Sequence, residues 1–275
     1  MTTCAIRAGF QRGLIELRQS FTNGAELFSH VFWPLLMLGA LWFMRDREFG
    51  ATGLMLGALA LPSILGMNIS FGMVSMSQIL TAEREDGTLL RAKATPNGML
   101  GYLIGKIVSV SGGLLADLAI FLIPGLFIID GLAVGGQTWP VLVLGMVATL
   151  PIGAILGSLF PSSRSQGLVQ LLAIGMIGIS GVFYPITALP EWLQWVAQVF
   201  PIYWLGLGMR SALLPADAVS VEIGESWRHV ETFGVLGAWA VLGLVVAPIV
   251  LRGMARGESG SSVAARRERA LRRVG

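Results

Sequence analysis

The sequence of 275 residues is far more apolar than that of a soluble protein of this length. Hydrophobic residues make up 54% of it and charged residues 13%, whereas a soluble domain carries about 25% charged residues. This composition excludes a large water-soluble domain, and the single cysteine, Cys4, excludes an internal disulfide and a cysteine-based metal site.

Residues 1–26 predict an amphipathic helix at the membrane surface. Basic and polar residues interrupt a periodic apolar stripe, and such helices lie at the interface between lipid headgroups and acyl chains. A cleaved signal peptide is the alternative, but its apolar core would be continuous. The stripe consists of Ile6, Phe10, Leu14, Leu17 and Phe21.

Residues 27–252 contain six apolar segments that are each long enough to cross the hydrocarbon core of a bilayer, roughly 30 Å thick. Pro124 is expected to kink the third segment. The sequence therefore predicts an all-α polytopic membrane protein with six spans. These are Leu27–Met44, Ala51–Ser77, Met99–Ile129, Trp139–Phe160, Leu168–Ile186 and Phe233–Leu251.

The distribution of Lys and Arg predicts the orientation of these spans. Basic residues concentrate in the head, in residues 81–96, in Ser162–Gly167 and in the tail, residues 253–275. Basic loops stay in the cytoplasm, so both termini are expected there, with the tail attracted to anionic lipid. The opposite side holds only Arg45, Arg47, Arg210 and Arg228.

Residues 81–96, TAEREDGTLLRAKATP, place a cluster of charges between the second and third spans. Gly87 weakens a helix in the middle of this segment, and Pro96 should end it. We expect a short helix along the cytoplasmic surface, and a solvated loop is the alternative. The charged residues are Glu83, Arg84, Glu85, Asp86, Arg91 and Lys93.

Residues 187–214 follow the fifth span and predict a helix that dips back into the outer leaflet without crossing it. Trp192, Trp195 and Val199 would share one face, and tryptophan prefers the membrane interface. Pro190 suits the first turn of such a helix. The acidic run that follows predicts a solvated loop, with a cation-attracting vestibule as the alternative. Its members are Asp217, Glu222, Glu225 and Glu231.

Asp117 lies near the middle of the third span, where carboxylates are costly and often functional. It could carry protons, meet a cationic substrate or serve in helix packing. The second span has a polar side with Asn68 and Ser70, and the nearby Met67 and Met73 suit apolar ligands. Ordinary packing is the alternative for all four.

The remaining chemistry-bearing residues predict no catalytic or metal site. His30 is expected to be an interfacial residue, His229 lacks neighbouring ligands, and no serine is expected to lie near a His–Asp pair. Residues 101–107 are the nearest approach to a phosphate-binding loop, but Ile107 stands where Ser or Thr should hold magnesium. Gly101 and Gly105 instead have the G-x-x-x-G spacing that permits close helix packing, as do Gly53/Gly57 and Gly153/Gly157.

Two motifs resemble those of ABC-2 type permeases, and the six spans and amphipathic head agree with that family. The sequence resembles drug-exporting members in particular, such as daunorubicin-resistance permeases. The first motif comprises Glu83, Arg84, Glu85, Gly87, Thr88, Leu89, Thr95, Pro96 and Lys106. The second comprises Gly181, Phe183, Pro185, Leu189, Pro190, Trp192, Pro201 and Tyr203, with Tyr184 as a departure from the usual pattern. Trp195 lies within the same segment.

The resemblance implies the membrane subunit of an ABC exporter in a prokaryotic plasma membrane. Such a subunit pairs with an identical or paralogous permease subunit and docks Glu83–Thr88 onto a separate nucleotide-binding subunit, which holds ATP and magnesium. It implies export of a hydrophobic or amphipathic compound, whether a drug, an antibiotic or a lipid-like molecule, along the first, second and fifth spans. No cofactor of its own and no nucleic-acid partner are expected. The alternatives are a proton-coupled secondary transporter that uses Asp117 and an intramembrane enzyme.

Overall fold

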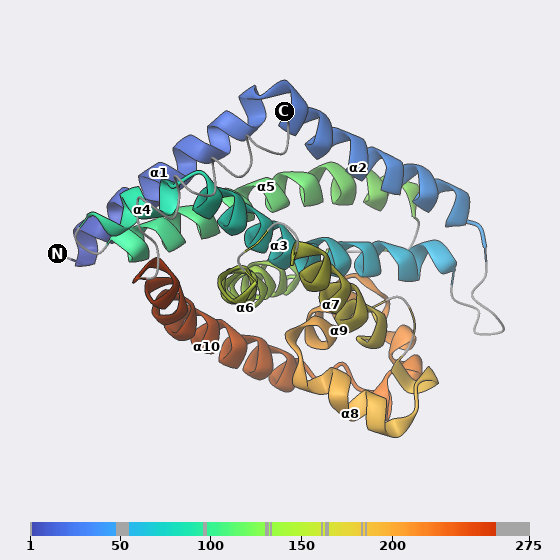
Figure 1. Cartoon of the computed structure of the whole chain (residues 1–275). Coiled ribbons are helices and arrows are strands. Elements are labelled where there is room, and N and C mark those ends of the chain that lie inside the picture. Colours follow the sequence, from blue (N-terminus) through green and yellow to red (C-terminus); the bar gives the residue numbers. More distant parts are fainter. Residues whose placement is uncertain are drawn as a thin grey trace.

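The computed structural model describes residues 2–47, 55–95, 98–129, 132, 134–160, 162, 165–182, 184 and 186–256. These residues form a bundle of α-helices with short 3-10 turns between the last ones (Figure 1). The α-helices are α1 (Thr2–Thr22), α2 (Gly24–Met44), α3 (Leu56–Glu85), α4 (Thr88–Lys93), α5 (Gly98–Ile128), α6 (Thr138–Leu159), α7 (Gln166–Ile179), α8 (Glu191–Val199), α9 (Pro201–Leu213) and α10 (His229–Arg256). The 3-10 turns are η1 (Ile186–Ala188), η2 (Ala216–Val221) and η3 (Ile223–Glu225).

In the described part of the chain, five helices are long and apolar enough to cross a membrane: α2, α3, α5, α6 and α10. They correspond to the first, second, third, fourth and sixth predicted spans. The second predicted span begins in residues outside the described part, and α3 continues eight residues beyond its predicted end, from Ser77 to Glu85. Helix α5 passes through Pro124 and ends at Ile128, close to the predicted boundary.

The fifth predicted span, Leu168–Ile186, is an apolar helix of only 14 residues, α7. At 1.5 Å per residue it is about 21 Å long, which is less than the thickness of the hydrocarbon core. The helix stops because Gly181 takes a left-handed backbone conformation, with φ +65°. A side chain there would meet the Cβ atom of Ile186 at 2.9 Å, so the turn requires glycine.

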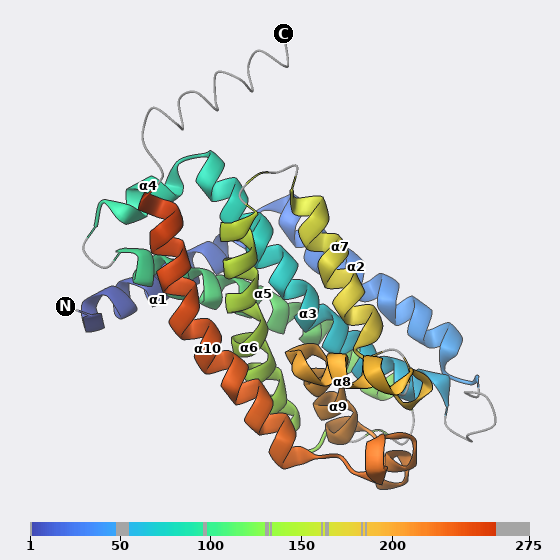
Figure 2. The same ribbon diagram turned by 60° about the horizontal axis from the view of Figure 1, so that its bottom comes forward.

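Helices α8 and α9 complete a hairpin at the end of the bundle opposite α4 (Figure 2). Pro190 is the N-cap of α8 and Pro201 is the first residue of α9, where its fixed φ suits a helix start. Helix α9 is buried along almost its whole length against α3, α6 and α10. Helix α4, the last turn of α10 and the end of α3 lie together at the other end, which we call the α4 end.

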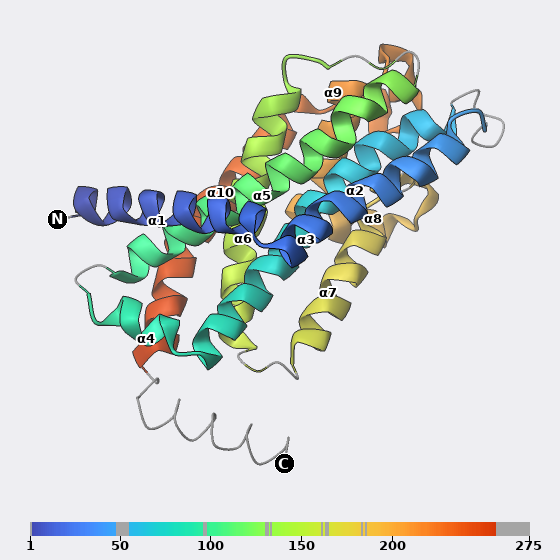
Figure 3. The ribbon, with the colours of Figure 1, turned by 90° about the horizontal axis from the view of Figure 1, so that it is seen from above.

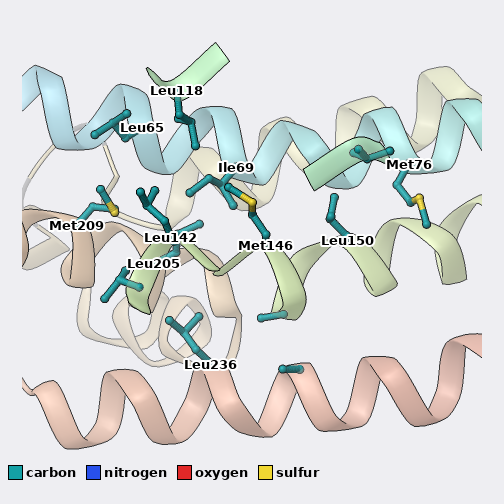
Figure 4. Close-up of a cluster of buried hydrophobic side chains, with 14 of the residues drawn as sticks. Leu65, Ile69, Met76, Leu118, Leu142, Met146, Leu150, Leu205, Met209 and Leu236 are labelled. Carbon is teal, nitrogen blue, oxygen red and sulfur yellow. The ribbon is translucent and has the colours of Figure 1, made fainter. Parts of the chain in front are cut away.

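The core lies where α3, α6, α9 and α10 meet (Figure 4). Leu65 and Ile69 of α3 face Leu142 and Met146 of α6, and Leu205 of α9 packs below them. Gly153 of α6 permits this close approach, because a Cβ atom there would lie 2.1 Å from the carbonyl oxygen of Met73. The predicted Gly153/Gly157 pair is therefore a true helix contact.

Helix α1 projects from the side of the bundle and packs along the first half of α5 (Figure 3). Glycines on both helices form this contact: a Cβ atom on Gly9 would lie 2.3 Å from the oxygen of Gly101, and one on Gly13 would lie 2.5 Å from the oxygen of Gly105. The sequence predicted that Gly101 and Gly105 lie at a helix contact, but it did not predict that α1 is the partner helix. Ile6, Phe10 and Leu14 of the predicted stripe are exposed on the outer face of α1.

The loop after α9 differs from the solvated acidic loop that the sequence predicted. Glu222 is only 3% exposed, and one of its carboxylate oxygens accepts a hydrogen bond from Nε of the buried Arg210 at 2.6 Å. Arg210 also donates to the carbonyl oxygen of Gly181 at 3.0 Å. This pair ties the end of α7 to α9 and to the loop. Glu225 and Glu231 are exposed, and the side chain of Asp217 lies outside the described part.

Candidate functional site

The charged segment 81–96 consists of two pieces joined at an angle. Residues 81–85 are the last turn of α3, and α4 begins at Thr88. Between them Gly87 has φ 83°, which would cost another residue about 1–2 kcal/mol. Asp86 Oδ1 accepts a hydrogen bond from the backbone N–H of Thr88 at 2.8 Å and so stabilises the turn that joins the two pieces. Pro96 lies outside the described residues.

Helix α4 presents one apolar and one polar face. Leu89 and Ala92 are buried, and α4 contacts α3, α5 and α10. Glu85, Asp86 and Arg91 are exposed, as is Lys93, whereas Arg84 and Thr88 are half-buried. A force applied to the exposed face of α4 would therefore reach three of the long helices through its buried face.

Glu83 does not belong to this exposed face. Its carboxylate accepts a hydrogen bond from Nζ of Lys106, which is only 5% exposed on α5. The same ammonium donates to Glu16 Oε2 of α1 at 2.6 Å, and Arg12 Nε donates to Glu16 Oε1 at 2.8 Å. The sequence predicted Glu83 as a docking residue and did not single out Glu16.

These four residues, Arg12, Glu16, Glu83 and Lys106, form what we call the internal charge cluster. It holds two positive and two negative groups and links α1, α3 and α5. Burial opposes the charged carboxylate of Glu16, but its hydrogen bonds from Lys106 and Arg12 outweigh that effect and lower its pKa. Burial likewise opposes the charge on Arg12, but Glu16 outweighs it and raises the Arg12 pKa.

A cavity of about 1610 Å³ extends from the internal charge cluster along α2, α3 and α5. Of the residues predicted to line a substrate path, Met67, Asn68 and Asp117 line this cavity. Ser70 is buried and donates to the backbone oxygen of Gly66, and Met73 is buried in a cluster with Ala173 and Ile177. Helix α7 contributes Gln170 to the lining. The cavity opens sideways, since Trp33, Ser75 and Gln78 line it and are exposed.

The prediction that no serine lies near a His–Asp pair is wrong. His30 Nδ1 lies 2.5 Å from Asp117 Oδ1, and His30 Nε2 lies 2.9 Å from Ser20 Oγ. His30 is therefore hydrogen-bonded through both ring nitrogens. Asp117 and His30 are separated by 87 residues, so their contact arises only when α2 packs against α5. All three residues line the cavity.

The predicted residues of the outer segment lie on and beside α8. Trp192 and Trp195 are 66% and 72% exposed and share one face with Val199, as predicted. The indole of Trp239 on α10 donates to the backbone oxygen of Val199 at 2.9 Å, which fixes the end of α8. Phe183 and Pro185 lie outside the described residues.

Taken together, the apolar helices define a multi-pass membrane protein. The sequence matches the family described as ABC-2 type transporter over residues 5–214, and no curated protein matches it. The chain belongs to the ABC-2 type transporter family. The matched region covers α1 to α9, and in this family it is a transport permease subunit that works with an ABC ATPase.

Proposed function

We propose that this chain is the membrane subunit of an exporter in a prokaryotic plasma membrane, driven by a separate ATPase that binds ATP and magnesium. The observation that carries the proposal is the construction of the α4 end. A short helix with an exposed charged face is packed through its apolar face onto α3, α5 and α10. Closure of an ATPase on that exposed face would move three long helices together.

The docking surface that we propose is narrower than the sequence predicted. It consists of Glu85, Asp86, Arg91 and Lys93, the exposed polar residues at the end of α3 and on α4. Glu83 lies beneath it and connects the end of α3 to α1 and α5 through Lys106. Glu83 is therefore a transmitting residue and not a contact for the ATPase.

The cavity supports export of an amphipathic or hydrophobic compound from the cytoplasm or the inner leaflet. It has a charged end at the internal charge cluster and apolar walls that include Met37, Met67 and Phe71. Its sideways opening leaves room for a second permease subunit, identical or paralogous, to complete the wall. The exposed apolar faces of α2 and α7 border that opening and would pack on the second subunit or on lipid.

The test is co-purification of the chain, in detergent or nanodiscs, with a candidate ABC ATPase encoded beside its gene. The double charge reversal Glu85→Lys/Arg91→Glu should weaken the complex, because two exposed contacts change sign. Reversal of Arg18 to Glu is the matched control, since Arg18 is exposed on α1, outside the docking surface. Equal recovery of the ATPase with both variants would contradict the proposed surface.

A further inference from the structure

The hydrogen-bonded residues Ser20, His30 and Asp117 have no role in the proposed docking of an ATPase, yet the structure holds them firmly. Phe21 stacks on the His30 ring with a centroid distance of 4.9 Å. Gly113 leaves room for that ring, because a Cβ atom there would lie 3.2 Å from His30 Cε1. The stacking of Phe21 and the hydrogen bonds at both nitrogens fix the ring beside Asp117.

With Asp117 ionised, the hydrogen bonds fix which nitrogen of His30 carries the proton. A carboxylate only accepts hydrogen bonds, so His30 Nδ1 donates to Asp117 Oδ1. In the neutral ring Nε2 then accepts from the hydroxyl of Ser20. With Asp117 ionised and His30 neutral, the negative charge stays on Asp117, whose side chain is 23% exposed and lines the cavity.

The same geometry occurs in hydrolases, but here it lacks the donors that hydrolysis requires. A serine nucleophile needs preorganised N–H groups to hold the oxyanion that forms. Ser20 lies inside α1, which extends to Thr22, so the backbone N–H groups around it are engaged in helical hydrogen bonds. The geometry therefore favours binding over acyl transfer.

The charge balance of the cavity favours a cation at Asp117. The lining carries three cationic side chains, Arg12, Arg91 and Lys106, and four carboxylates, Glu16, Glu26, Glu83 and Asp117. Glu16 and Glu83 pair with Arg12 and Lys106, and Glu26 and Arg91 are exposed, whereas Asp117 is part-buried and faces an imidazole. Lys106 is about 16 Å away along α5, at 1.5 Å per residue, so its charge does not compensate Asp117 directly.

The walls around Asp117 suit the apolar part of such a ligand. Trp33 and Met37 follow His30 at helical spacing on α2, and Met67 and Phe71 line the cavity from α3. Methionine adapts to varied apolar shapes, and aromatic faces attract cations. We propose that Asp117, oriented by His30 and Ser20, binds the protonated amine of an amphipathic compound whose apolar part lies on these residues. The proposal names the cargo class and rests on the proposed export function.

The test uses a BODIPY fluorophore that carries an alkyl primary amine, and the same compound with its amine acetylated. Binding of both to the purified chain in lipid nanodiscs is measured by fluorescence anisotropy at neutral pH. We expect the amine to bind about tenfold to a hundredfold more tightly than the acetamide, the range of a charge-assisted hydrogen bond. Equal binding of the two compounds by the wild type would overturn the proposal, and this comparison needs no variant.

Variants then locate the site. Asp117→Asn should abolish the preference for the amine, and Asp117→Glu should keep most of it. Glu26→Gln is the matched control, because Glu26 is an exposed carboxylate in the same cavity lining. A preference that persists in Asp117→Asn would overturn the proposal, as would a preference lost only in Glu26→Gln.

Two further measurements begin with the wild-type chain, so that the location of the site can be tested even if the Asp117 variants fail to fold. A photoreactive analogue of the amine should crosslink to peptides of α2, α3 or α5, and labelling confined to other helices would count against the site. Covalent labelling of Ser20 by a fluorophosphonate, lost in His30→Asn, would assign a nucleophile instead. None of these measurements needs the ATPase, so binding at Asp117 and docking at α4 can fail independently.

Discussion

Lys106 places a positive charge inside the protein, where it is stable only with partners. Its ammonium is bonded to carboxylates of two other helices, Glu16 and Glu83, whose side chains are 21% and 19% exposed. Lys106 therefore links α1 and the end of α3 to α5 through two charged hydrogen bonds.

Replacing Lys106 by methionine should destabilise the chain by about 3 kcal/mol, the lower end of the range for breaking a buried ion pair. Two carboxylates would be left close together without a cation between them. Thermal unfolding in nanodiscs measures the loss. Lys93→Met, on the exposed face of α4, should change the transition temperature little, and a similar drop in both variants would refute the role of Lys106.

The lowered pKa of Glu16 makes the docking of α1 sensitive to acid. Because the folded pKa lies below the ordinary value of 4.5, the stabilisation is complete above that value and is lost as the pH falls through the folded pKa. The difference in stability between wild type and Glu16→Gln should therefore be largest at neutral pH and shrink below pH 4.5. Unfolding temperatures measured across a pH series test this, and a difference that grows on acidification would contradict it.

At the scale of the element, α1 is a helix whose position depends on glycine. Gly9→Ala should push α1 away from α5, because the added methyl group would overlap the backbone of Gly101. We expect a loss of roughly 1–3 kcal/mol, as for overpacking in a core. Gly39→Ala on α2 is the control, since nothing lies within 4 Å of its added Cβ atom. Equal unfolding temperatures for the two variants would exclude the close contact.

The packing of α9 against the end of α7 and against the loop after α9 depends on the ion pair of Arg210 and Glu222, whose side chains are 5% and 1% exposed. Arg210→Met alone should cost about 3–5 kcal/mol, because it leaves Glu222 buried without a partner. The double variant Arg210→Met/Glu222→Met should recover much of that loss. A loss in the double variant equal to the sum of the losses in Arg210→Met and Glu222→Met would show that the two residues contribute independently.

The sequence predicted elements better than it predicted contacts. Apolar length is a local property, so five long apolar helices of the described chain lie near predicted spans, and the Trp192/Trp195 face followed from helical spacing. The predicted end of the fifth span lies too far along the chain, because the apolar composition continues past Gly181, where the backbone turns. The pairs Glu16–Lys106, His30–Asp117 and Arg210–Glu222 depend on helix packing, which periodicity does not encode.

At the scale of the whole molecule, the N-terminal helix and the last turn of α10 lie at the α4 end (Figure 2). We predict that this end is cytoplasmic. Cys4, the only cysteine, is exposed. A membrane-impermeant maleimide should label it in inverted vesicles and not in intact cells.

Ser226→Cys in a Cys4→Ser background supplies the opposite probe, because Ser226 is exposed near η3. It should be labelled in intact cells. The reverse pattern at both sites would invert the orientation, and labelling of both from one side would contradict the arrangement of the spans.

The sideways opening of the cavity has a consequence for the life of the protein before it is assembled. If a second permease subunit closes this opening, as we propose, an unpaired copy would leave the exposed Ser75 and Gln78 of α3 uncovered, and polar groups without partners are costly in lipid. In that arrangement, these exposed polar side chains would distinguish an unpaired copy from an assembled one. Membrane proteases that recognise such polar surface would then remove unpaired copies and spare paired ones, so that the amount of permease in the cell would follow the amount that assembles.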